Sequence, residues 1–152
     1  MLKVKAGEKR TPQDLRIDLI APCGMNCGLC MCYLREKNTC EGCRSGDKGK
    51  SKSVLSCTIR KCEMVPESNL RFCLDCAKLP CPRLKRLDAR YREKYRMSML
   101  ENLHAIRENG TEKFVESERA RWRCSECGGV QCVHTAECIY CGYVWTTTIL
   151  AG

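Results

Sequence analysis

Cysteines are the residues of this sequence most able to carry out chemistry or bind metal. There are 16, and many recur in pairs separated by two residues. Thiolates at this spacing converge on one metal ion, and zinc is the metal that four-cysteine sets most often hold. Near the C-terminus, two Cys-x2-Cys-Gly turns follow one another. We predict one tetrahedral zinc there, with four thiolate ligands: Cys124, Cys127, Cys138 and Cys141.

The segments around these turns are rich in β-favouring residues. Strands are predicted at 130–134 and 143–149, which would complete a β zinc ribbon. Cys132 and His134 lie two residues apart, on one face of the first strand. Because the turn cysteines already complete a tetrahedron, we expect packing or polar roles for both residues, and a second exposed metal site is the alternative.

A second cysteine cluster runs from residue 23 to residue 81. It contains more thiols than its obvious division into four-cysteine sites would use. Cys27-x2-Cys30 with Cys40-x2-Cys43 would form one four-cysteine site, and Cys57-x4-Cys62 with Cys73-x2-Cys76 another. Interleaved pairing fits the sequence equally well. Cys23, Cys32 and Cys81 are left over, and some of these three would be buried thiols that behave as small apolar groups. The predicted ligands of this cluster are Cys23, Cys27, Cys30, Cys40, Cys43, Cys57, Cys62, Cys73, Cys76 and Cys81.

Part of this cluster also has iron–sulfur spacing. Cys23-x3-Cys27-x2-Cys30 is the pattern by which radical enzymes hold a cluster with an open iron, and Cys81 before Pro82 could supply a fourth ligand. Those enzymes need a barrel-like domain larger than this chain, so the radical-enzyme interpretation is weak. An iron–sulfur cluster for electron transfer is the alternative to a cofactor set of three or more zinc ions.

The connector between the two clusters contains no cysteine and is predicted to be helical. Apolar residues recur there at three- and four-residue steps from Leu84 to Tyr95. Ser98 opens a capping box that starts a second helix, and Asn109-Gly110 ends it. A third, short helix should extend to about Arg121.

The remaining composition predicts a fold that depends on metal. Only 29 of the 152 residues are Leu, Ile, Val or Phe, which is near the level at which charged chains stay disordered. We therefore predict a small metal-stabilised α+β fold. Its parts are a flexible arm (1–18), an irregular cysteine-rich multi-metal module (19–82), an α-helical connector (83–121) and a C-terminal β zinc ribbon (122–152).

The sequence shows no membrane span and no export signal. No stretch approaches the roughly 20 apolar residues that a span requires, and the first 18 residues lack an apolar core. We expect a cytoplasmic protein whose thiols meet a reducing environment, which favours metal ligation over disulfides.

The cysteine motifs of the first cluster together resemble a known family. They are Cys23-Gly-x2-Cys27-Gly-x-Cys30, Cys40-x-Gly-Cys43, Cys57-x-Ile-Arg-x-Cys62, Phe72-Cys-x2-Cys76 and Leu79-Pro-Cys81-Pro-Arg83-Leu84. This set resembles domain of unknown function 3795 over about residues 19–110. The tail, Trp122-x-Cys124-x2-Cys127-Gly-Gly129 with Cys132-Val-His134, resembles the ribbon that some members carry. The resemblance implies metal binding in archaeal and bacterial cytoplasm and carries no activity. Cys32 is additional to the family pattern.

Charge points to local basic segments more than to a basic protein. The formal net charge of +9 counts every cysteine as neutral. Each zinc with four thiolates carries a net charge of −2, so three such sites would leave about +3. Residues 44–61 and 83–96 remain basic, whereas 124–152 contain no Lys or Arg. The candidate phosphate-binding residues are Arg44, Lys48, Lys50, Lys52, Arg86, Arg90 and Lys94.

Three functions compete on this evidence. We expect a non-catalytic interaction module for nucleic acid, with RNA favoured over DNA because no DNA-reading helix motif is visible, or for a protein that contacts the ribbon. The alternatives are an iron–sulfur or zinc-thiolate redox protein or enzyme, and a thiol or metal sensor that uses the spare cysteines. No catalytic signature is present, so an enzyme is not the expected outcome.

Overall fold

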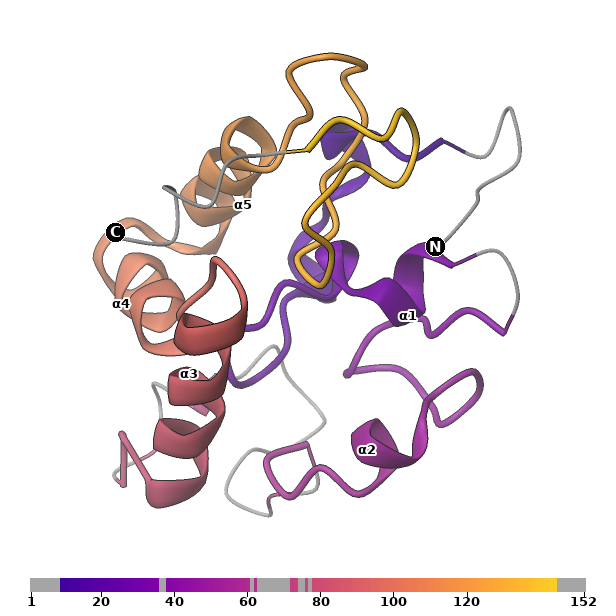
Figure 1. The fold of residues 1–152 in the computed structure, drawn as a ribbon. Helices are drawn as coiled ribbons and strands as arrows, with labels where there is room; N and C mark the ends of the chain where they lie inside the picture. Colours follow the sequence, from indigo (N-terminus) through magenta and orange to yellow (C-terminus); the bar gives the residue numbers. More distant parts are fainter. Residues whose placement is uncertain are drawn as a thin grey trace.

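The computed structural model describes residues 9–35, 38–60, 62, 72–73, 76 and 78–144. In Figure 1 the helices of residues 82–121 lie along one side of the molecule, and the loops of the N-terminal cysteine cluster lie on the other. The α-helices are α1 (Met31–Leu34), α2 (Lys52–Leu55), α3 (Pro82–Lys94), α4 (Met99–Asn109) and α5 (Thr111–Arg121). Among the described residues, 3₁₀ helices at Pro12–Asp14, Ile17–Leu19 and Cys27–Leu29 precede α1. Within these residues, no helix is both long and apolar enough to span a membrane.

Helix α3 confirms the predicted connector helix and its apolar face. Pro82 occupies the first turn, where its missing N–H is no loss. Leu84 is fully buried, while Leu87 and Tyr91 are partly buried against the same core. The apolar periodicity of the sequence therefore identified the side of α3 that faces the protein.

Asp88 joins α3 to the start of α4. Its carboxylate accepts hydrogen bonds from Ser98 Oγ at 2.6 Å, the Leu100 amide at 3.0 Å and Arg92 Nε at 2.7 Å. Ser98 Oγ in turn accepts from the Glu101 amide at 3.1 Å, which confirms the predicted N-cap. Burial alone would raise the pKa of Asp88. The hydrogen bonds have the larger, opposite effect and bring the pKa below its ordinary value.

Replacing Asp88 with Ala should destabilise the protein by about 2–4 kcal/mol, because the Ser98 hydroxyl and the Leu100 amide would lose their acceptor. The contribution of Asp88 is present above its unfolded pKa of about 3.9 and is lost as the pH falls through its lower folded pKa. Urea unfolding from pH 3 to pH 7 measures both effects. Glu93→Ala, an exposed change on the same helix, is the control; equal stability of the two variants would contradict this role for Asp88.

Glycine ends α4 as predicted. Gly110 has a φ of +88°, in the region that favours glycine, and its amide donates to the Ile106 carbonyl at 2.8 Å. The chain then turns directly into α5, whose inward residues Phe114 and Val115 are buried. Helix α4 packs against both α3 and α5, so the three helices form one layer.

The predicted β ribbon is not formed as a sheet. In the described part of the C-terminal segment, the strand pairing is limited to isolated bridges, Arg123 with Val130 and Glu137 with Val144. The backbone donors go to different segments: the Val130 amide donates to the Arg10 carbonyl at 3.0 Å and the Val133 amide to the Leu29 carbonyl at 2.9 Å. Buried amides must find acceptors, and here the acceptors come from the N-terminal part of the chain. Residues 145–149 of the second predicted strand lie outside the described residues.

One buried cluster connects all parts of the molecule. It includes Leu29 from the N-terminal module, Leu103 from α4, and Trp122 and Val133 from the C-terminal segment. The described end of the arm also contributes, because Leu15 is 2% exposed. The loops that carry the cysteines are therefore held against a common core.

Candidate metal centre

Four cysteines of the C-terminal segment meet at one point. The sulfur atoms of Cys124, Cys127, Cys138 and Cys141 all lie within 4.8 Å of one another. Cys124 Sγ is 3.7 Å from Cys141 Sγ, and Cys127 Sγ is 3.6 Å from Cys138 Sγ. A regular tetrahedron with zinc–sulfur bonds of about 2.3 Å has edges of about 3.8 Å. This set is therefore able to hold one metal ion in the geometry that zinc adopts.

The two turns that carry these cysteines repeat one backbone arrangement. The Gly128 amide donates to the Cys124 carbonyl and the Gly142 amide to the Cys138 carbonyl, each at 2.9 Å. Both glycines have positive φ, +73° and +80°, which a side chain at these positions would strain. The Cys-x2-Cys-Gly spacing thus predicted the local geometry, even though the flanking strands are not formed.

The thiols of this site differ in acidity. Burial raises the pKa of Cys138 to about 12. Burial also raises the pKa of Cys127, but the Gly129 amide, 3.4 Å from its sulfur, and the neighbouring thiols lower it more, to about 7. Metal binding requires the thiolate form and releases the remaining protons.

Cys132 and His134 lie apart from this tetrahedron. Cys132 is fully buried in the core. His134 Nδ1 accepts from the Met31 amide at 3.1 Å, and its Nε2 lies 2.9 Å from the Tyr91 hydroxyl. Both ring nitrogens are thus occupied within the protein, as expected for a polar packing role. Burial lowers the pKa of His134, which favours the neutral ring.

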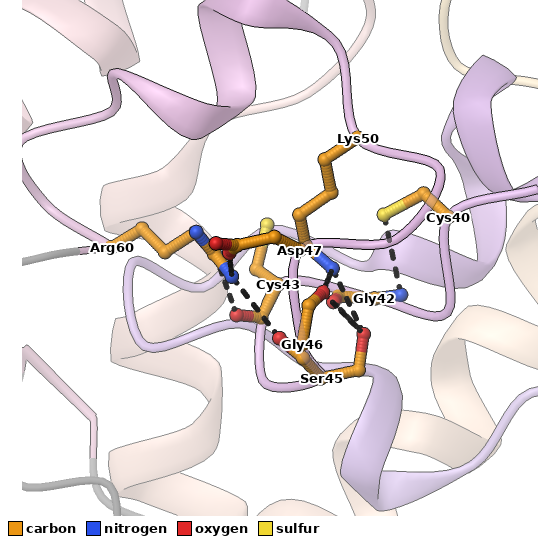
Figure 2. Close-up of polar contacts among 8 residues, drawn as sticks. All are labelled: Cys40, Gly42, Cys43, Ser45, Gly46, Asp47, Lys50 and Arg60. Carbon is orange, nitrogen blue, oxygen red and sulfur yellow. Dashed lines mark hydrogen bonds and ion pairs between the residues drawn. The ribbon is translucent and has the colours of Figure 1, made fainter.

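Six cysteines of the N-terminal cluster line a cavity of about 680 Å³ between the N-terminal loops and α3. They are Cys23, Cys27, Cys30, Cys32, Cys43 and Cys57. Arginines of α3 and the Tyr91–His134 pair complete the wall. Cys40 lies in the adjoining loop, where its sulfur accepts from the Gly42 amide at 3.4 Å (Figure 2).

Two thiol pairs stand out in the cavity wall. Cys27 is hydrogen-bonded to Cys43, whose amide also donates to Cys27 Sγ at 3.4 Å. The Cys27 thiol and the cations of Lys50 and Arg60 hold the pKa of Cys43 at about 7. Cys30 is hydrogen-bonded to Cys32 in the same way.

The remaining described cysteines of the first cluster, Cys62, Cys73, Cys76 and Cys81, do not line this cavity. Burial raises the pKa of Cys73 to about 12, and the nearby thiols of Cys81, Cys62 and Cys76 also raise it. Cys57, which the simplest pairing from the sequence groups with Cys62, Cys73 and Cys76, lines the cavity.

Two of the predicted phosphate-binding residues support the loop instead of extending into solvent. Lys50 is 9% exposed, donates to Ser45 Oγ at 2.9 Å and contacts the Gly46 carbonyl (Figure 2). Arg44 is half-buried, and its Nε donates to the Ile20 carbonyl at 2.7 Å. Arg60 stabilises the same loop through Asp47 at 2.7 Å and the Cys43 carbonyl at 3.2 Å. Sequence reasoning missed this role because the contacts join residues that no local pattern connects.

Fold and sites together define a small helix-rich protein with cysteine clusters able to bind metal. Residues 19–86 match the model of the family described as "Protein of unknown function (DUF3795)". The match confirms the resemblance seen in the cysteine motifs, and it ends within α3. Neither the curated proteins nor the solved structures contain a significant match to the chain.

Proposed function

We propose that this protein is a zinc-stabilised interaction module whose exposed basic surface binds RNA. The observation that carries the zinc assignment is the tetrahedral spacing of the four C-terminal sulfurs, 3.6 and 3.7 Å along two edges. Four thiolates leave no open position for a substrate, so the role of this ion is structural. It holds the C-terminal segment in place against the core.

The RNA-binding part of the proposal rests on one face of α3. Arg86, Arg90 and Lys94 follow one another at four-residue steps and are all exposed. Lys48 and Lys52 extend the basic surface from the loop side. The sequence predicted seven phosphate-binding residues, of which Arg44 and Lys50 stabilise the loop instead. The five exposed cations that remain form the proposed RNA-binding surface.

The combined variant Arg86→Gln, Arg90→Gln and Lys94→Gln should weaken RNA binding and flatten its salt dependence. For single-stranded RNA, each phosphate that the protein no longer neutralises lowers the slope of log affinity against log salt by about 0.7. Fluorescence titrations of single-stranded and duplex RNA at low and near-physiological salt measure the slope.

The matched control for this variant is Lys113→Gln, an exposed cation on α5. It should leave the slope unchanged, and the metal content of both variants should equal that of the wild type. No RNA binding at low salt would exclude RNA and favour a protein partner, and equal slopes for the wild type and the triple variant would exclude this face of α3 as the RNA-binding surface.

A further inference from the structure

The cavity of the N-terminal module differs from the C-terminal site in how its thiols are spaced. Six cysteines line it, but among the described residues the candidate ligand group close enough to hold one ion is the C-terminal four, Cys124, Cys127, Cys138 and Cys141. A single zinc ion requires four sulfurs about 3.8 Å apart. The cavity thus brings many thiolates to one space without the compact tetrahedron of a mononuclear site.

We propose that this cavity holds a polynuclear iron–sulfur cluster, ligated by Cys23, Cys27, Cys30 and Cys43. In such a cluster the thiolates bind the irons at the periphery, one or two to each iron, while inorganic sulfide bridges the irons in the middle. This arrangement suits thiolates that surround a cavity of about 680 Å³ better than one central ion does. Arg86 and Arg90 belong both to this cavity wall and to the surface proposed for RNA, but the metal content of the cavity is measured without RNA.

The choice of ligands follows from the neighbours of each thiol. Cys23, Cys27 and Cys30 come from one short segment, ending in the 3₁₀ helix Cys27–Leu29 and its C-cap. Cys43 reaches the same wall from the next loop, where its amide donates to Cys27 Sγ at 3.4 Å. Amide hydrogen bonds to ligand sulfur are one of the means by which proteins stabilise such clusters.

Charge on α3 complements the cluster. Arg83, Arg86 and Arg90 line the cavity on one side of this helix. Four thiolates and their irons carry net negative charge, and three guanidinium groups at the rim offset it. Arg83 is oriented by the Thr58 carbonyl, 3.4 Å from its Nη1.

Tyr91 and His134 supply a directed hydrogen bond to the cavity. The Met31 amide donates to His134 Nδ1 at 3.1 Å, so in the neutral ring the proton resides on Nε2. His134 Nε2–H then donates to the Tyr91 oxygen at 2.9 Å, which leaves the Tyr91 O–H to donate into the cavity. Tyr91 is therefore a positioning residue that stabilises negative charge on cluster sulfur.

The test is anaerobic reconstitution of the full-length, zinc-loaded protein with ferrous iron and sulfide. We expect roughly two to four iron atoms per chain, a matching amount of acid-labile sulfide and visible iron–sulfur absorption. Cys27→Ser should lose the iron and keep the C-terminal zinc. Cys141→Ser, the matched control, should keep the iron and lose that zinc. Zinc alone in the N-terminal module after reconstitution, or full iron in Cys27→Ser, would overturn the proposal.

Two further variants keep the test decisive if Cys27→Ser fails to fold. Cys43→Ser changes a less buried ligand and should also lose the iron. Tyr91→Phe keeps the ring and removes only the hydroxyl, so it should retain the iron while the reduction potential becomes more negative. An unchanged potential would refute the hydrogen bond, and retention of full iron by folded Cys43→Ser would refute the ligand set.

Discussion

Removal of metal from the reduced protein is expected to abolish its cooperative unfolding transition. Large aliphatic and phenylalanine residues number only 29 of 152, too few to offset the conformational entropy of so many loops. The cysteine-bearing segments form turns and single-turn helices, and no sheet supports them within the described residues. Because the metal sites do not exist in the unfolded chain, the free energy of metal binding contributes directly to the free energy of folding.

Calorimetry with and without a strong chelator at neutral pH measures this effect, with free thiols counted after the chelator is added. Zinc added back should restore the transition, and an equal concentration of magnesium should not, because magnesium prefers oxygen ligands. A full melting transition in metal-free, reduced protein would contradict the prediction.

Replacing Trp122 with Ala should cost about 3–5 kcal/mol of stability, because a large side chain that is 1% exposed would leave a cavity. The guanidinium groups of Arg96 and Arg121 lie 4.9 and 4.8 Å from its ring centre. Its indole N–H donates to Glu118 Oε2 at 2.9 Å. Trp122 is thus held at the end of α5 by the hydrogen bond to Glu118, and its cation–π contact with Arg96 joins it to the segment between α3 and α4.

Two conservative changes separate these contributions in urea unfolding. Trp122→Phe should cost about 1.5–3 kcal/mol, since it removes the N–H donor of a buried carboxylate. Burial raises the pKa of Glu118, so its ionised form weakens the fold as the pH rises above the unfolded value of about 4.3. Glu118→Gln should remove that pH dependence without loss of stability at neutral pH. Equal stability of Trp122→Ala and the wild type would refute the structural role of Trp122.

The features predicted correctly from sequence are those that depend on near neighbours. The apolar steps of α3, the Ser98 cap and the Gly110 stop each follow from residues within about one helical turn. The same holds for the turns that begin at Cys124 and Cys138, where a glycine with positive φ directly follows the second cysteine. Local spacing was sufficient for these elements.

The features that were missed depend on contacts between distant segments. The Val133 amide finds its acceptor at Leu29, so the β-favouring residues of this segment do not pair with a neighbouring strand. Arg44 is half-buried, and its Nε donates to the Ile20 carbonyl, 24 residues earlier in the chain. Neither the partner of a backbone amide nor that of one arginine follows from a local pattern.

The hydrogen bonds between the two ends of the chain also constrain how this protein can evolve. The Arg10 and Leu29 carbonyls receive their donors from Val130 and Val133, and the Arg10 amide donates to the Tyr140 hydroxyl at 2.9 Å. A gene rearrangement that removed the C-terminal segment would expose these groups together with Leu29, which is fully buried. Descendants that lost the segment would need polar replacements at Leu29 and its neighbours. Insertion or loss of this segment should therefore leave a trace as coordinated substitutions far away in the N-terminal sequence.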